Sequence, residues 1–189
     1  MKKDIIVGLD LGTTKVCAVI AEKIPEQNRI DVLGFGVAPS EGLHKGLVAN
    51  IGKTAEAIKS AMAIASNRAG FEVTVVNVGV AGEHITSMRH RNYVTINRDE
   101  KEITKEDLER LEADVRTIRI PSDRQILHII PEEFSIDHQS GIENPIGVSG
   151  SRLEASNHVV LASIPAMENI RKSVERAGYQ VQDYILQPI

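Results

Sequence analysis

An aspartate lies inside an apolar segment near the start of the chain, in the stretch IIVGLDLGTTKVCAVI. Placing a carboxylate in apolar surroundings costs free energy unless another group offsets its charge. Gly12, Thr13 and Thr14 follow it, and the backbone N–H groups and hydroxyls of such a turn bind anions such as phosphate. Asp10 would repel a phosphate unless a divalent cation lay between them, and Mg²⁺ binds through one or two carboxylates plus phosphate oxygens while keeping waters. We therefore predict that Asp10 orients a hydrated Mg²⁺ and that the turn binds phosphoryl groups.

This turn differs from two common nucleotide-binding loops. A Walker loop requires Gly-x-x-x-x-Gly-Lys-Ser/Thr followed by a helix, whereas Lys15 follows two threonines and precedes a second apolar run. A dinucleotide-type Gly-x-Gly-x-x-Gly pattern does not occur at this position either. Lys15 either reaches the same anion or points to solvent. The alternative to a phosphate site is a plain hairpin in which Asp10 caps the turn.

The composition argues against several other kinds of site. A net charge of −4 and the lack of tryptophan argue against nucleic acid as a partner. Cys17 is the single cysteine, so an internal disulfide cannot form and a reducing compartment fits best. The six histidines lack the spacing of a zinc site. The N-terminus has no apolar stretch long enough for a signal peptide or a membrane-spanning helix, which favours the cytoplasm.

The segments around the turn predict an α/β fold. Runs rich in Ile and Val predict two strands, suited to burial on both faces, at Ile5–Asp10 and Val16–Glu22. A third strand is predicted at Ile30–Ala38. A loop is expected over residues 39–50. A helix is predicted over Ile51–Ala69, because apolar residues recur at helical spacing and Gly70 follows. Another strand is expected within residues 71–82.

The middle of the chain is more polar. A helix is predicted over residues 104–118, where Thr104 and Asp107 resemble a capping box. Further predictions are strands within residues 84–96 and 152–164, strands at Arg124–Ile130 and Glu133–Asp137, a loop over 138–150, a helix over Pro165–Ala177, and a strand at Val181–Leu186. The predicted organisation is one α/β domain, residues 1–84 and 165–189, interrupted by a smaller α+β insert at residues 85–164.

Two parts of the sequence together resemble a known family. The stretch GLDLGTTK is similar to the first phosphate loop of the actin, sugar-kinase and heat-shock-chaperone ATPase superfamily. The stretches VGVAGEHITSM, EITKEDLERL, IPSDRQILHIIPEEFSID and IENPIGVSGSRLEASNHVV resemble the bacterial cell-division family FtsA. The resemblance covers essentially the whole chain, at the length of the N-terminal part of that family, so we expect a fragment of a longer protein. It implies half of an actin-like ATPase core, with a ribonuclease-H-like mixed sheet and flanking helices. The two outer segments would be subdomain 1A and the insert subdomain 1C.

The resemblance also implies cofactors and site residues. ATP and Mg²⁺ would be bound in the full-length protein, with Asp10 at the metal and Gly12, Thr13, Thr14 and Lys15 at the phosphates. Residue 187, a glutamine in LQPI, would occupy the position that orients the attacking water. An amide orients water but is a poor general base, so we expect at most weak ATP hydrolysis and no further enzymatic activity.

The function that the resemblance implies is a scaffold. Such proteins polymerise at the cytoplasmic face of the cell membrane at the division site, anchor the FtsZ ring and recruit later division proteins. In the family, the FtsZ-tail site and the C-terminal amphipathic helix that binds the membrane belong to parts outside residues 1–189. The alternatives are a sugar or acyl kinase of the same superfamily, a chaperone ATPase, and a protein-interaction module with a degenerate nucleotide site.

Residues 1–189 are expected to bind ATP very weakly or not at all. The resemblance places the second phosphate loop beyond residue 189, so several charge-assisted hydrogen bonds to phosphate would be missing. Isothermal titration calorimetry with Mg-ATP checks this expectation, and a micromolar affinity would contradict it.

Overall fold

The computed structural model describes residues 4–187, which divide between two compact units. The first unit takes its residues from the ranges 1–84 and 163–189, and the second consists of residues 85–162. The predicted insert was placed at residues 85–164, so its expected end lies two residues further along the chain than the end of the second unit. Among the described residues, no helix is both long and apolar enough to span a membrane.

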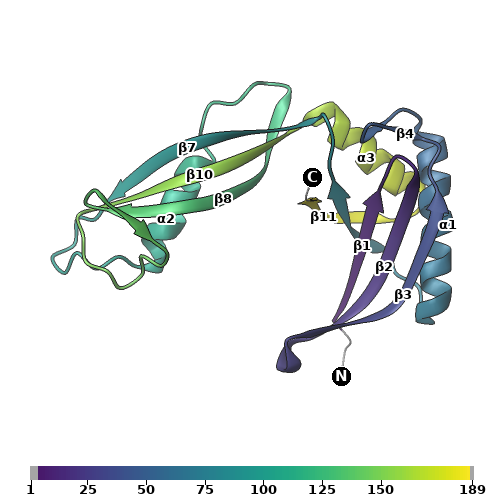
Figure 1. The fold of residues 1–189 in the computed structure, drawn as a ribbon, viewed down its shortest axis with the longest axis horizontal. Helices are drawn as coiled ribbons and strands as arrows, with labels where there is room; N and C mark the ends of the chain where they lie inside the picture. Colours follow the sequence, from purple (N-terminus) through teal and green to yellow (C-terminus); the bar gives the residue numbers. More distant parts are fainter. Residues whose placement is uncertain (1–3, 188–189) are drawn as a thin grey trace. The chain divides into compact units, whose positions relative to one another are not determined.

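A five-stranded mixed sheet forms the first unit (Figure 1). Its strands are β1 (Ile5–Leu11), β2 (Lys15–Ile24), β3 (Arg29–Pro39), β6 (Val75–Val80) and β11 (Gln180–Leu186). The strand order is β11-β6-β1-β2-β3, with β1, β6 and β11 parallel to one another and β2 antiparallel to both of its neighbours. Parallel strands bring their carboxyl ends to one edge of the sheet, so the ends of β1, β6 and β11 lie together there.

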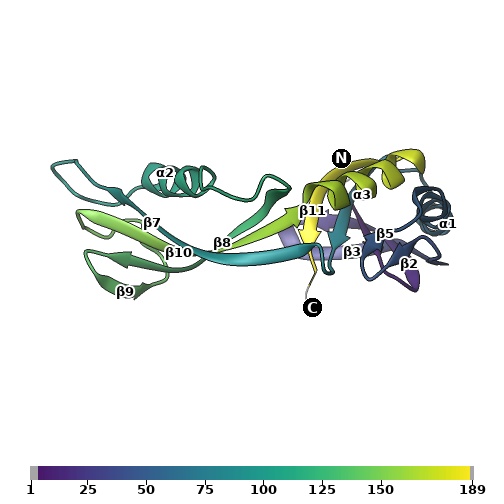
Figure 2. The same cartoon turned by 90° about the horizontal axis from the view of Figure 1, so that it is seen from above.

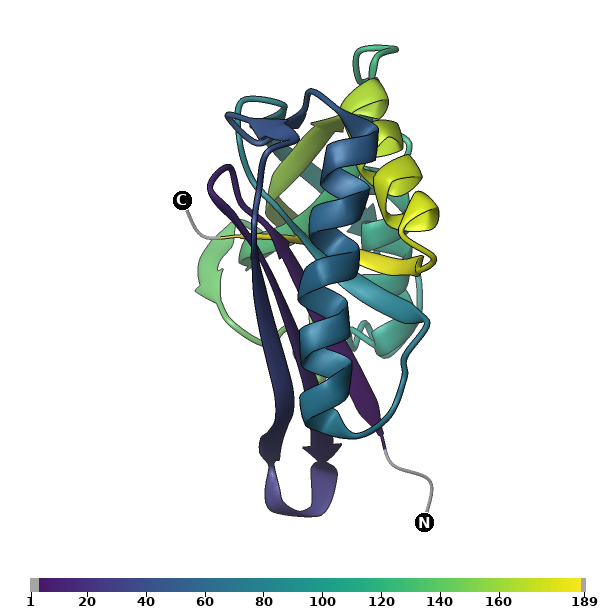
Figure 3. The same cartoon turned by 90° about the vertical axis from the view of Figure 1, so that its right-hand side faces the viewer.

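Two helices cover one face of this sheet (Figures 2 and 3). Helix α1 (Ile51–Ala69) has the predicted bounds, and α3 (Ile164–Arg176) lies beside it. The Asn50 side chain accepts a hydrogen bond from the Lys53 backbone N–H at 2.9 Å, and Gly70 ends the helix in the left-handed conformation. These are standard N-cap and C-cap devices, which is why the sequence located both ends of α1.

The prediction that the strands are buried on both faces is wrong. In β1, Val7, Leu9 and Leu11 are buried, whereas the residues between them are only half-buried. The buried set faces α1 and α3. Among the described residues of the first unit, α1 and α3 are the α-helices, so no helix of this unit covers the opposite face of the sheet. Asp10 therefore lies on the more open face, and not in a closed core.

The segment expected as a loop between β3 and α1 contains a small hairpin. It consists of β4 (Leu43–His44) and β5 (Leu47–Val48), which pair with each other in antiparallel fashion. Lys45 and Gly46 form its turn with φ values of 49° and 78°. Two positive φ values in succession suit a two-residue hairpin turn, although a lysine in that conformation gives little signal in the sequence. A short 3-10 helix (Pro25–Gln27) connects β2 to β3.

The second unit is a four-stranded sheet with one helix on one face (Figure 2). It contains β7 (Ile85–Thr95), α2 (Lys105–Val115), β8 (Arg124–Ile136), β9 (Gln139–Ile142) and β10 (Arg152–Ser163), with the strand order β7-β10-β8-β9. Leu111 of α2 packs with Ile103 and Leu153 in a buried apolar cluster. The predicted helix over residues 104–118 is three residues too long at its C-terminal end.

Two further predictions in this unit are wrong. The strands expected at Arg124–Ile130 and Glu133–Asp137 are a single strand, β8, which continues through Pro131. β9 pairs with β8 at Phe134 and Ile136, beyond the proline, and β8 continues through Pro131 without a break. The loop expected over residues 138–150 contains β9.

The predicted capping box at the start of α2 is confirmed. Asp107 is fully buried, and its carboxylate accepts hydrogen bonds from the Thr104 backbone N–H at 2.9 Å and from the Thr104 hydroxyl at 3.0 Å. Arg98 and Arg110 also donate to it. Burial by itself would raise the pKa of Asp107, but the hydrogen bonds from Arg98 and Thr104 outweigh it and hold the pKa below its usual value.

Candidate functional site

Asp10 and Gln187 are 177 residues apart in the chain, and the first unit brings their side chains together. Asp10 lies near the carboxyl end of β1, and Gln187 directly follows β11. The Gln187 Nε2 group donates a hydrogen bond to Asp10 Oδ1 at 2.9 Å, and the Gln187 backbone N–H donates to the carbonyl of Val80 at 3.0 Å. The half-buried carboxylate therefore has a donor that partly offsets the cost of placing it there.

A backbone hydrogen bond within the turn after β1 joins its two ends. The Gly12 N–H donates to the Lys15 carbonyl at 3.0 Å, and a Cβ atom at Gly12 would lie 2.7 Å from that oxygen, so glycine is required. The Thr14 carbonyl accepts from the Ser40 N–H at 3.1 Å, which fixes the turn against the end of β3. Within residues 4–187, the backbone N–H groups of Thr13 and Thr14 have no hydrogen-bond partner. Both threonines are exposed, so these donors are available to an anion.

The residues at this edge fit a hydrated Mg²⁺ beside phosphate. In the described part of the chain, no group of three or more His, Cys, Asp and Glu side chains could hold a metal ion directly. Asp10 supplies one carboxylate, and an ion that keeps most of its waters needs only one or two. The Gln187 carboxamide adds an oxygen that can accept from water. Lys15 is exposed and makes no ion pair among the described residues.

Gly79 also lies at this edge, although the sequence pattern predicted no role for it. In the β1–β6 register it lies opposite Asp10. A Cβ atom at Gly79 would lie 2.9 Å from Cδ and 3.1 Å from Cγ of Gln187, and closer still to Nε2. The glutamine side chain thus lies directly against the glycine. A glycine inside a strand often marks such a close approach, and this signal was present in the sequence.

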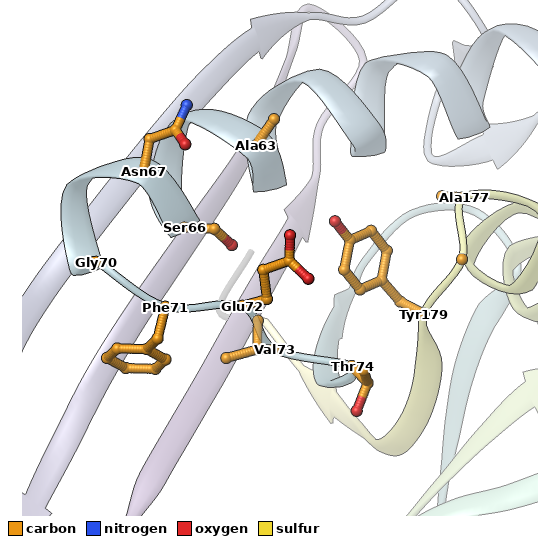
Figure 4. A pocket seen from close by; sticks show the side chains of 11 residues that line it. Ala63, Ser66, Asn67, Gly70, Phe71, Glu72, Val73, Thr74, Ala177 and Tyr179 are labelled. Atoms are coloured by element: carbon orange, nitrogen blue, oxygen red, sulfur yellow. The ribbon is translucent and has the colours of Figure 1, made fainter.

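A cavity of about 590 Å³ lies at the other end of the parallel strands (Figure 4). It is lined by the end of α1 and by the residues that lead into β6 and β11, and Figure 4 shows the Glu72 carboxylate and the Tyr179 hydroxyl pointing into it. Burial first, and the charge of Glu72 second, raise the pKa of Tyr179, so the phenol stays protonated at neutral pH. None of the predicted site residues lines this cavity, and ligands of open α/β sheets bind at the carboxyl ends of the strands instead.

Comparison with known families gives a match in the second unit. Residues 82–161 match the family described as "SHS2 domain inserted in FTSA". This range begins three residues before β7 and ends within β10.

Comparison with curated proteins extends the similarity to nearly the whole chain. Cell division protein FtsA of Pseudomonas aeruginosa is 40% identical over 184 residues, which are 97% of this chain and 43% of the relative. FtsA of Borreliella burgdorferi is 36% identical over 98% of this chain and 45% of its own length. FtsA of Escherichia coli K12 is 33% identical over 97% and 43%. The chain spans less than half the length of these relatives.

Comparison with solved structures concerns the fold alone. A structure titled "PilM-PilN type IV pilus biogenesis complex" aligns with a TM-score of 0.65 at 16% identity, over 97% of this chain and 47% of the other. Together with the SHS2 match, this likeness confirms the predicted fold class, a partial actin-like core with a mixed sheet, flanking helices and an inserted α+β unit.

Proposed function

We propose that this chain, which is similar to FtsA cell-division proteins over nearly all of its length, is part of an ATP-binding, actin-like division scaffold. The observation that carries the ATP-binding part of the proposal is the hydrogen bond between Gln187 and Asp10 beside the open N–H groups of the turn. A carboxylate, a water-orienting amide and a phosphate-binding turn converge at the carboxyl ends of parallel strands. A carboxylate for hydrated Mg²⁺ and free backbone N–H groups for phosphate are groups that a Mg-nucleotide site uses.

Each of these groups has a distinct task in the proposal. The Asp10 carboxylate accepts hydrogen bonds from the waters of Mg²⁺, and the ion, when bound, neutralises charge on the phosphate oxygens. The N–H groups of Thr13 and Thr14 bind phosphate oxygens. The Gln187 carboxamide orients a water molecule, and because an amide is a poor general base, hydrolysis is at most slow. ATP would therefore serve mainly as a bound ligand that sets the conformation of the protein.

The wider role is proposed for a protein of the length of the relatives. We propose that such a protein self-associates into filaments at the cytoplasmic face of the membrane, links the FtsZ ring to that membrane and recruits later division proteins. The similarity to FtsA proteins supports this proposal. In it, the first unit contributes one side of the nucleotide site, and the second unit contributes contacts with filament neighbours and division partners.

Replacing Asp10 with alanine is expected to remove the response of the turn to Mg-ATP. In ¹⁵N–¹H spectra of the wild-type chain, millimolar Mg-ATP should shift the backbone amides of residues 12–15, because phosphate would accept from them. In Asp10→Ala these shifts should vanish, because no carboxylate would then hold the hydrated ion. Asp31→Ala is the matched control, since it removes the same charge from β3, where Asp31 pairs with Arg29. Shifts that persist in Asp10→Ala would contradict the proposal. If residues 1–189 bind ATP too weakly to shift the wild type, the same pair of variants is compared in a protein of the length of the relatives, where equal Mg-ATP affinity of wild type and Asp10→Ala would contradict it.

A further inference from the structure

The path of the Gln187 side chain passes over a neighbouring strand. Gln187 follows β11, Asp10 lies on β1, and β6 lies between these two strands. Neighbouring strands are about 4.8 Å apart, so the glutamine must reach across the full width of β6 to donate to Asp10. The residue of β6 at this level is Gly79, which is in register with Asp10 on one side and with Ile185 on the other.

Gly79 leaves the space that the glutamine occupies. A Cβ atom at this position would lie 2.9 Å from Cδ and 3.1 Å from Cγ of Gln187. Real Cβ atoms almost never come that close to another heavy atom, so any side chain at position 79 would have to displace the carboxamide. The atoms displaced belong to a flexible side chain and not to the backbone. Gly79 is also outside the set of residues with positive φ in the described chain, so alanine suits its backbone conformation.

We propose that Gly79 is a positioning residue that holds the Gln187 carboxamide against Asp10. The proposal rests on the proposed function in one respect, the role of Gln187 in orienting water. A side chain at position 79 would leave the sheet intact, because only the flexible end of Gln187 must move. It would break the hydrogen bond between Gln187 and Asp10, and so separate the water-orienting group from the carboxylate without altering either residue.

Gly8 provides a matched control. It lies on β1, two residues before Asp10 and therefore on the same face of the sheet, and it is in register with Asn77 of β6. A Cβ atom at Gly8 would meet no other heavy atom within 4 Å. Gly8→Ala and Gly79→Ala are thus the same chemical change on adjacent strands, and only the second one reaches Gln187.

The test is the side-chain amide resonance of Gln187, measured on the chain without nucleotide. In Gly79→Ala the two Nε2 proton signals are expected to move to their positions in Asp10→Ala, where the acceptor is missing. In Gly8→Ala they should stay at the wild-type positions, and both glycine variants should keep a wild-type pattern of backbone amides. Wild-type Gln187 signals in Gly79→Ala would overturn the proposal. Loss of the folded pattern in that variant alone would also overturn it, since Gly79 would then support the sheet and not the glutamine.

This result is independent of ATP binding. If the Gln187 signals respond as expected while Mg-ATP acts equally on the wild type and Asp10→Ala in the longer protein, the positioning role of Gly79 stands and the proposed nucleotide site fails. If Mg-ATP shifts the backbone amide resonances of the turn in the wild type but the Gln187 Nε2 signals are unchanged in Gly79→Ala, the nucleotide site stands and the positioning role is wrong.

Discussion

Gly36→Ala is expected to destabilise the first unit by about 3 kcal/mol, near the upper end of the range for overpacked cores. Gly36 lies on β3 and faces α1, where a Cβ atom would be 2.8 Å from the Ala65 backbone nitrogen and 2.9 Å from Cβ of Ile64, and closer still to the Ala61 carbonyl oxygen. These atoms belong mostly to the helix backbone, which cannot rotate away as a side chain can. The helix would therefore have to move off the strand and lose contacts along its buried face.

Urea unfolding of the wild type, Gly36→Ala and Gly8→Ala measures this difference. Both variants add one methyl group to a strand of the same sheet, but the one at Gly8 would meet no heavy atom within 4 Å. Gly8→Ala is expected to be neutral or to stabilise by a few tenths of a kcal/mol, because alanine restricts the unfolded chain. Equal free energies of unfolding for the two variants would show that α1 does not depend on this close approach.

The parts of the first unit that the sequence predicted well depend on neighbouring residues. Helix α1 was located because Asn50, Gly70 and the apolar spacing between them are local signals. The turn after Asp10 was located for the same reason. The strand order was not readable from periodicity, since the pairing of β1 with β6 joins residues that are about seventy positions apart. The role of Gly79 depends on that order, because the glycine matters only once β6 lies between β1 and β11.

The pairing of Asp10 with Gln187 shows where a family resemblance adds to residue patterns. Composition and spacing indicated that Asp10 needed a partner but did not identify Gln187, whose position followed from the resemblance alone. The structure places the Gln187 amide 2.9 Å from the Asp10 carboxylate. Whether the two act on a nucleotide stays a prediction, and the spectroscopic tests above address it.

In the second unit, too, predictions from neighbouring residues were correct, and predictions that depend on strand pairing were not. The capping box of Thr104 and Asp107 spans three residues and was predicted correctly. A break was expected between Ile130 and Glu133, but β8 runs through this segment, Pro131 included. A proline within a strand is the exception, and β9 pairs with β8 only beyond it, at Phe134 and Ile136. Such an exception depends on which strand lies beside the proline, and residues 124–137 alone do not contain that information.

Asp107→Asn is expected to destabilise the second unit by about 2–3 kcal/mol at neutral pH. The carboxylate is fully buried and accepts from Arg98, Arg110 and both donors of Thr104. Asparagine keeps the shape and one acceptor, so the N-cap interaction is partly preserved while the charge-assisted hydrogen bonds are lost, each with a typical contribution of about 1.5–3 kcal/mol. The Arg98 side chain is half-exposed, so water can hydrate its guanidinium group once the carboxylate is gone. The loss of stability is therefore smaller than for a fully buried ion pair.

The pH dependence of this difference separates the charge from the shape of Asp107. Because the folded state lowers the pKa of Asp107, its contribution to stability is fully present above the unfolded value of about 3.9 and is lost as the pH falls through the folded pKa. The difference in free energy of unfolding between the wild type and Asp107→Asn should therefore be constant from pH 7 to pH 5 and shrink near pH 3. Glu109→Gln is the control, since Glu109 makes only an exposed pair with Lys105 at 3.8 Å and should change stability by less than about 0.5 kcal/mol. A difference that stays constant into strong acid would mean that Asp107 stabilises α2 by its shape and not by its charge.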